Sequence, residues 1–378
     1  MTTQPLRPGS LSRLATLAEG GSSHYGEACE TVISERLGGS PVLLMSSCTH
    51  ALETCFLLLD IKPGDEVVTA SFQFPSVANA IALRGGTPVF VDVDPDTLCL
   101  DVDAAAAAIT SRTRAVVAMH YGGVGHDVQR LADLCHRRGV ALVEDAAQAI
   151  GAAFAERPLG TYGAFATFSF HKTKNVQCGE GGALVVNDSR YLDAAYRVRD
   201  KGTDRRDFAR GLVSRYRWTG LGSSYVLSEV QAAVLAGELE ELDSITARRI
   251  EIWRRYRDGL GAVDSLRLLR PAPEAAHNAH TFVVIANSAE HRSSLLGALR
   301  EVGVAASFHY QPLHSAPAGQ RYGRFVGADR HTTDLANRLI RLPISDRMEP
   351  HEVERIIDLT SDLAGRTNWT PRDVAKRR

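Results

Sequence analysis

Between residues 40 and 190, short apolar runs rich in β-branched residues alternate with longer amphipathic segments. The short runs are typical of buried strands, whereas longer segments such as 49–59 and 128–138 are typical of helices. The predicted strands cover residues 41–45, 66–70, 88–93, 115–120, 140–144, 165–170 and 182–187. Strands that alternate with helices predict an α/β fold, with a mostly parallel central sheet covered on both faces.

The pattern changes after about residue 230. A long helical stretch rich in Glu and Arg is predicted from residue 228 toward 256. A second α/β unit follows, with a strand at 282–286, a helix near 292–302 and a last β-like run at 304–310. We therefore expect an N-terminal arm over residues 1–20, a large domain over 21–240 and a smaller C-terminal domain over 241–378.

Composition and charge narrow the class of protein. Of the 378 residues, 44% are hydrophobic and 23% are charged, which is typical of a soluble globular protein. The formal net charge of −1 gives no basic field for nucleic acid, and only the C-terminal tail TPRDVAKRR is locally basic. No apolar run has the length of a membrane span, and the N-terminus lacks the apolar core of a signal peptide. We expect neither a nucleic-acid nor a membrane partner.

The six cysteines are scattered and form no C-x-x-C pair. A zinc ribbon or a thioredoxin-type site is therefore not indicated, and no metal is expected. Several cysteines lie in apolar stretches, where a free thiol packs as a small hydrophobic group. This usage suits a reducing compartment, so we expect a cytoplasmic protein.

Two polar clusters stand at the ends of predicted strands. Residues 44–49 (LMSSCT) lead from a strand into a helix, whose first N–H groups can bind a phosphate. Taken alone, such residues are more often an ordinary helix cap. Residues 143–148 (VEDAAQ) end a strand with two carboxylates, at the sheet edge where ligands gather in α/β proteins. A carboxylate there could pair with a ring cation or cap the next helix.

A third cluster, FSFHKTKNVQCGEGG, carries two lysines, Lys172 and Lys174, in a loop after a predicted strand. Glycines follow that allow close backbone approach. A desolvated lysine becomes a nucleophile toward carbonyls, although loop lysines are usually solvated. Together, a phosphate cradle, a strand-end carboxylate and a loop lysine are the parts that pyridoxal 5′-phosphate (PLP) needs.

These motifs resemble those of the PLP-dependent sugar-nucleotide aminotransferases of the DegT/DnrJ/EryC1/StrS family, over about residues 20–365. The resemblance implies an aspartate aminotransferase-like fold (PLP fold type I). It also identifies the covalent anchor of the cofactor as Lys174, the lysine followed by Asn and then by Gly-Glu-Gly-Gly, rather than Lys172.

Further cofactor contacts follow from the resemblance. Asp145 matches the carboxylate that pairs with the pyridine nitrogen, and Gln148 matches the contact to the ring hydroxyl. Phe74 matches the aromatic residue stacked on the ring, which would otherwise be interpreted as a core residue. The matches to the phosphate-binding residues are Cys48, Thr49 and Ser169.

One family position departs from the usual pattern. Many members have an asparagine that reaches the phosphate across a dimer interface, and SSYVLSE here places Ser224 there. Serine can still donate to a phosphate, although its reach is shorter. The resemblance implies a homodimer with shared active sites. It also implies that His309 and Tyr310, in FHYQPLH, contact the substrate, whereas a histidine in an apolar strand is as often structural.

The segments DKGTDRRDF, YRWTGLGSSY and FHYQPLHSAPAGQRYG are most similar to the branch that acts on dTDP-4-keto-6-deoxyhexoses. The resemblance thus implies transfer of the amino group of L-glutamate to the C4 ketone, giving a gluco or galacto dTDP-4-amino-4,6-dideoxyhexose. The alternatives are a 3-aminotransferase acting on a dTDP-3-keto-6-deoxyhexose and a non-catalytic PLP-binding regulatory protein. A sugar 3-dehydratase of the same fold would have histidine in place of Lys174.

Overall fold

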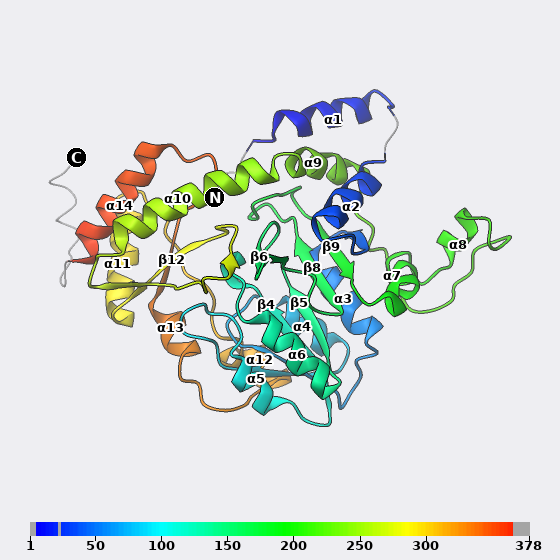
Figure 1. Cartoon of the computed structure of the whole chain (residues 1–378), viewed down its shortest axis with the longest axis horizontal. Coiled ribbons are helices and arrows are strands. Elements are labelled where there is room, and N and C mark those ends of the chain that lie inside the picture. The colour runs from blue at the N-terminus through cyan, green and yellow to red at the C-terminus, as the bar shows by residue number, and fades with distance from the viewer. Residues whose placement is uncertain (1–4, 22–23, 366–378) are drawn as a thin grey trace.

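The computed structural model describes residues 5–21 and 24–365, and the basic tail at 370–378 lies outside these residues. Its main element is an eight-stranded sheet with the order β1-β9-β8-β5-β4-β2-β3-β13 (Figure 1). The strands are β1 (Val42–Met45), β2 (Glu66–Ala70), β3 (Thr87–Val91), β4 (Thr113–Met119), β5 (Ala141–Asp145), β8 (Phe165–Ser169), β9 (Gly182–Val186) and β13 (Arg324–Phe325). Only the two pairings of β9 are antiparallel. The predicted mostly parallel α/β sheet is confirmed.

Helices cover both faces of this sheet. Their bounds in the first part of the chain are α1 (Pro8–Ala18), α2 (Tyr25–Arg36), α3 (Cys48–Leu58), α4 (Ser76–Leu83), α5 (Val102–Ala108), α6 (Val128–Arg138), α7 (Leu192–Arg199), α8 (Arg205–Ala209) and α9 (Glu229–Leu239). Alternate strand residues enter two separate cores. Val42 and Leu44 join the core under α2, α5, α6 and α9, whereas Leu43 and Met45 join the core under α3, α4 and α7.

A second, antiparallel sheet has the order β10-β12-β14 and its own core. It consists of β10 (Leu266–Leu268), β12 (Phe282–Ala286) and β14 (Leu339–Leu342). The helices of this part are α10 (Leu242–Leu260), α11 (Ala289–Glu301), α12 (Pro317–Tyr322), α13 (Thr332–Arg338) and α14 (Pro350–Ala364). A small third sheet joins β6 (Ala153–Phe154), β7 (Arg157–Pro158) and β11 (Ala275–Ala276).

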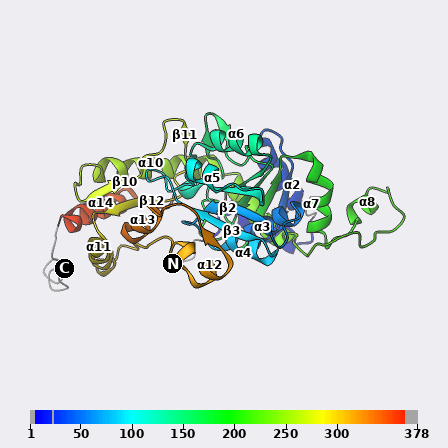
Figure 2. The same ribbon diagram turned by 90° about the horizontal axis from the view of Figure 1, so that it is seen from below.

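Helix α10 connects the two main parts of the molecule (Figure 2). Leu242 and Ile245, near its start, lie in the core of the large sheet. Ile252, Tyr256 and Leu260, in its second half, lie in the core of the small sheet. One continuous helix therefore contributes side chains to both cores.

Two details of the second half of the chain differ from the sequence expectation. The single helix predicted from residue 228 is two helices, α9 and α10, with a break at Glu240 and Glu241. The predicted run at 304–310 is not a strand. It forms a single bridge, between Ser307 and Arg341. Within residues 5–21 and 24–365, no helix is both long and apolar enough to cross a bilayer.

Candidate active site

The start of α3 supplies free amides. Ser47 caps the helix from an extended conformation, and its hydroxyl accepts the His50 N–H at 3.1 Å. The amides of Cys48 and Thr49, at the first two helical positions, have no carbonyl one turn earlier to bind. The Thr49 hydroxyl lies 2.9 Å from that of Ser76, at the start of α4. The helix is thus capped by Ser47 and still presents donors for an anion at its N-terminus.

Gly182 brings strand β9 against this helix start. It pairs with Met45 on one side and with Ser169, the last residue of β8, on the other. A Cβ atom on Gly182 would collide with the backbone nitrogen of Cys48. The last glycine of the Gly-Glu-Gly-Gly tract is therefore required by close packing, and Ser169 lies one strand away from the α3 amides.

Strand β5 ends in two carboxylates that point to opposite faces. The pKa of Asp145 is raised mainly by burial, while the Ala147 amide, Lys174 and His120 act in the opposite direction. The Ala147 N–H donates to its Oδ1 at 3.1 Å. A cation placed against Asp145 would offset the cost of burying its charge, which is the role expected for a protonated pyridine nitrogen.

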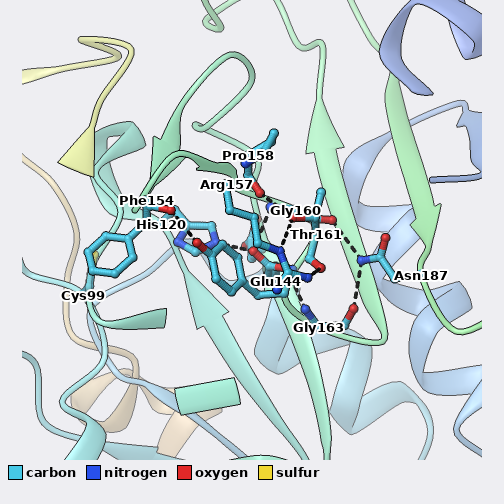
Figure 3. A network of polar contacts seen from close by, with 12 residues as sticks. Cys99, His120, Glu144, Phe154, Arg157, Pro158, Gly160, Thr161, Gly163 and Asn187 are labelled. Atoms are coloured by element: carbon cyan, nitrogen blue, oxygen red, sulfur yellow. Dashed lines mark hydrogen bonds and ion pairs between the residues drawn. The ribbon is translucent and has the colours of Figure 1, made fainter. Parts of the chain in front are cut away.

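Glu144 faces a different network, shown in Figure 3. Its fully buried carboxylate accepts the backbone N–H groups of Gly160, Tyr162 and Gly163 at 2.6–2.8 Å and lies 3.0 Å from His120 Nε2. These bonds hold the 160–163 loop against strand β5. Glu144 is therefore a structural residue, although it adjoins Asp145 in the sequence.

The two loop lysines have different environments. Lys172 is exposed, whereas Lys174 is partly buried. Burial lowers the pKa of the Lys174 amine, and Arg341 acts in the same direction, while Cys48 and Asp145 oppose it. Lys174 therefore shares one site with the α3 N-terminus and the β5 carboxylate. Its lowered pKa favours the neutral amine that attacks carbonyls.

The residue after Lys174 fastens the lysine loop to a distant segment. The Asn175 amide donates to the Asn278 carbonyl at 3.0 Å, and its Oδ1 lies 2.9 Å from His280 Nδ1. The Asn278 amide in turn donates to the backbone carbonyls of Gln148 and Ile150, both at 2.9 Å. The sequence analysis did not identify Asn278 or His280, since only folding brings them near the lysine loop.

Tyr310 and His309 reach the site from the C-terminal part of the chain. The Gln148 amide donates to the Tyr310 hydroxyl at 3.1 Å, and its Oε1 accepts the Gly122 N–H at 2.7 Å. His309 Nδ1 lies 3.0 Å from the Tyr121 hydroxyl, and His309 Nε2 contacts Arg341. Tyr121 and Arg341 are further site residues absent from the sequence prediction. An arginine inside the apolar run LIRLP is the signal that could have identified the latter.

The two remaining predicted residues are exposed, and of these only Phe74 lies beside another site residue. Phe74 is 59% exposed, with its ring centroid 6.3 Å from that of Tyr310. Ser224 is exposed and pairs through a backbone bridge with Asp200. It makes no contact with Lys174 within the described part of the chain.

These residues fit PLP. The α3 amides suit its phosphate, the buried Asp145 suits its ring nitrogen, and the Lys174 amine suits its aldehyde. When bound, PLP supplies a carbonyl for the amino group and a sink for electrons. Burial and Asp145 raise the pKa of the Cys48 thiol to about 12, so this thiol is neutral and cannot compete as a nucleophile.

The fold and the comparisons with known proteins agree on one class, the PLP-dependent aminotransferases. Residues 15–360 match the sequence profile of the DegT/DnrJ/EryC1/StrS aminotransferase family, and the chain belongs to this family. The resemblance noted in the sequence is thereby confirmed at the level of the family, as are the enzyme class and the cofactor.

Solved structures of related proteins extend over nearly the whole chain. The aminotransferase TlmJ from Streptoalloteichus hindustanus is 32% identical, with a TM-score of 0.88 over 96% of this chain and 97% of its own. DesV from S. venezuelae is 30% identical, with a TM-score of 0.87 over 95% of each chain. A sugar aminotransferase from Streptococcus pneumoniae, solved in its PLP form, is 22% identical and has a TM-score of 0.87 over 96% of this chain and 99% of its own, a likeness of fold alone.

Proposed function

We propose that the enzyme moves the amino group of L-glutamate to the C4 ketone of a dTDP-4-keto-6-deoxyhexose, as in the dTDP-4-amino-4,6-dideoxygalactose transaminase type. The observation that carries this proposal is the position of FHYQPLH. This segment, most similar to the 4-keto-sugar branch, brings Tyr310 to Gln148 and His309 to Tyr121. The structure of the S. pneumoniae sugar aminotransferase has the same fold, which is compatible with a sugar substrate.

The residues have distinct tasks in this proposal. The Lys174 amine holds the cofactor at rest and, once released, removes the proton from Cα of the donor. Asp145 keeps the ring nitrogen of the cofactor protonated, and the amides at the start of α3 hold the phosphate. Phe74 covers the ring face, while Ser169 supports the phosphate from β8. The second half-reaction runs through the same groups in reverse.

We further propose a homodimer with shared active sites. The segment around α8 projects from the body of the molecule (Figure 1). Bridges between Asp200 and Ser224 and between Thr203 and Trp218 close its base. It exposes five large apolar side chains, Phe208, Leu212, Tyr216, Trp218 and Leu221. An apolar surface of this kind is typical of a protein interface, and a partner subunit could receive Ser224 at its phosphate site.

Incubation of the purified enzyme with PLP, L-glutamate and dTDP-4-keto-6-deoxyglucose tests the function. We expect NMR of the product to show nitrogen at C4, and the coupling of the C4 proton to distinguish an equatorial from an axial amine. Lys174→Ala is the control and should give no product. Nitrogen at C3, or a dehydrated sugar, would contradict the proposal, and absence of any reaction with PLP bound would favour a regulatory protein.

A further inference from the structure

The residue that follows Lys174 is bonded at both ends of its side-chain amide. Asn175 is only 6% exposed, although amide side chains mostly face water. Its Nδ2 donates to the Asn278 carbonyl at 3.0 Å, and its Oδ1 lies 2.9 Å from His280 Nδ1. Because Oδ1 can only accept, Nδ1 of His280 carries the proton of this hydrogen bond. Asn175 is therefore fixed by one acceptor and one donor from the same distant segment.

That segment, residues 278–280, lies shortly before strand β12 and contains a strained residue. Ala279 has a φ of +50°, a left-handed conformation that costs free energy in a residue with a Cβ atom. Arg249 of α10 donates from Nε to the Ala279 carbonyl at 3.1 Å and from Nη2 to the His280 carbonyl at 2.8 Å. The buried guanidinium thus stabilises the segment in an unfavourable conformation. Backbone strain that a fold retains in this way is concentrated at functional sites.

The 278–280 segment also binds the chain that follows strand β5. The Asn278 side-chain amide donates to the carbonyls of Gln148 and Ile150, both at 2.9 Å. Asn278 Oδ1 in turn accepts the His280 N–H at 3.1 Å, and both side chains are buried. Gln148 is the predicted contact to the ring hydroxyl of PLP. One segment is therefore bonded to the residue beside the predicted anchor and to the backbone of a second predicted cofactor contact.

Close packing leaves this connection little room to shift. Gly123 has a φ of +74°, and a Cβ atom there would collide with Asn278 Oδ1 and with the carbonyl oxygen of Gln148. Gly122 donates its N–H to Gln148 Oε1 at 2.7 Å. Both the backbone and the side chain of Gln148 are consequently held in place, and the bonds from Asn278 lie in a buried environment that strengthens them.

The chemistry of transamination requires an accurately placed amine. A lysine side chain is a flexible four-carbon chain, so the position of its amine depends on how firmly its backbone is held. The amine must meet the aldehyde of the cofactor at rest and, after release, the Cα proton of the donor. A misplacement of about 1 Å can lower a rate about 100-fold. Bonds that fix the backbone of Lys174 relative to Gln148 therefore serve both steps.

We propose that Asn175 is a positioning residue for Lys174: the 278–280 segment holds its amide so that the lysine amine is aligned with the cofactor both when it is covalently linked and after its release. The proposal rests on the assignment of Lys174 as the anchor under the proposed function, and it does not depend on which sugar accepts the amino group. Burial lowers the pKa of His280 well below its usual value, so the ring acts as a donor without adding a charge to this network.

Assembly of the holoenzyme tests the proposal without a substrate. When PLP is added to the apoenzyme, the rate constant for the appearance of the covalently linked absorbance should fall about 10- to 100-fold in Asn175→Ala, because the free amine is no longer aligned. Gln177→Ala is the matched control. It removes another side-chain amide of the same loop, which accepts the Gly179 N–H at 2.9 Å, and should match the wild type.

Variants of His280 identify the hydrogen bond that matters. His280→Phe retains a ring but has no donor for Asn175 Oδ1, so it should slow the attachment of PLP as Asn175→Ala does. His280→Gln can still donate through its side-chain amide and should recover part of the rate. Because both changes remove the same bond, the double variant of Asn175→Ala with His280→Phe should be no slower than the slower single variant.

The donor half-reaction separates positioning from a general structural effect. In single turnovers at saturating PLP, the limiting rate of Asn175→Ala with L-glutamate should again fall about 10- to 100-fold. The half-saturating concentration of L-glutamate should change less than about threefold, because alignment rather than binding is lost. Excess PLP restores a rate that is lost only through weak cofactor binding, so a defect that persists at saturation supports the proposal.

Attachment of PLP at the wild-type rate in Asn175→Ala would overturn the inference. A defect in turnover that excess PLP abolishes would make Asn175 structural and also overturn it, as would equal rates for His280→Phe and His280→Gln. If the wild type does not react with glutamate, the proposed donor is wrong, and the rates of PLP attachment still decide the inference. If Lys174→Ala retains the linked absorbance, the anchor is another residue and the inference fails with it.

Discussion

At the scale of residues, neighbours with the same side-chain chemistry have different tasks. Glu144 and Asp145 are adjacent carboxylates, yet one holds the 160–163 loop and the other faces Lys174, because side chains alternate across a strand. Lys172 and Lys174 are two positions apart, yet the first is exposed and the second is partly buried. Burial therefore distinguishes the proposed cofactor anchor from an ordinary lysine of the same loop.

The lysine assignment has a direct test. Lys174→Ala should lose the absorbance of the covalently linked cofactor together with the transamination activity, because among the described residues no second amine acts on Asp145. Lys172→Ala, which changes an exposed side chain, should retain both. Spectra and activity of the two purified variants decide the matter, and the reverse pattern would assign the anchor to Lys172.

His126 should make the stability of the protein sensitive to acid. Its ring is fully buried, and both nitrogens lack a partner among the described residues. Burial, with His120 adding to it, lowers the pKa of His126 from 6.5 to about 3. Between pH 6.5 and 3, His126 is therefore protonated in the unfolded chain and neutral in the folded chain. The stability is fully present above pH 6.5 and falls as the pH drops toward 3.

Urea unfolding of wild type and His126→Leu at pH 7.5 and 5 measures this effect. Between these values, the wild type should lose about 2 kcal/mol more free energy of unfolding than the variant. At pH 7.5 the variant should be at least as stable, since leucine leaves no buried polar atom unpaired. Equal losses in the two proteins would show that His126 does not respond to pH as described.

Much of this residue-level site could be predicted from sequence, but only where its parts are local. Lys174 lies beside the glycine tract and Asp145 beside Gln148, so spacing along the chain is enough to propose their roles. Arg341, Asn278 and His280 act through contacts with residues more than 30 positions away, such as His309, Gln148 and Asn175. No short motif encodes such contacts.

At the scale of elements, the phosphate cradle depends on how closely β9 approaches α3. Gly182→Ala should place a methyl group against the Cys48 amide, cost about 1–3 kcal/mol and weaken PLP binding about tenfold or more. PLP titration of the apoenzyme measures the affinity. Gly297→Ala, where an added Cβ meets no atom within 4 Å in α11, is the matched control and should leave PLP affinity unchanged.

The element boundaries show where local patterns stop being informative. The β-branched runs predicted every parallel strand of the large sheet that precedes residue 190, because burial on both faces leaves a continuous apolar segment. The break between α9 and α10 at Glu240 and Glu241 carries no Pro or Gly to mark it. Strand β13 has only two residues. It is a strand only because it pairs with β3 at the edge of the sheet, and its own sequence is too short to predict it.

At the scale of the whole molecule, the proposed dimer predicts that disrupting the interface lowers both the mass in solution and the activity. Trp218 is 76% exposed, and Leu221 lies nearby on the same projecting segment. Replacing both by serine should shift the mass in solution toward that of one chain and lower the activity with it. Light scattering after size exclusion measures the mass. An unchanged dimer would mean that this segment is not the interface.

Helix α10 has a consequence for the way the enzyme loses its structure. The first turns of α10 belong to one hydrophobic core and its later turns to the other. Unfolding of either core would therefore also disrupt a helix that packs in the other core. Calorimetry should accordingly show the two parts of each chain unfolding in one transition. The same helix couples the small sheet, which carries Arg341, to the large sheet, whose strand β8 leads into the loop of Lys174.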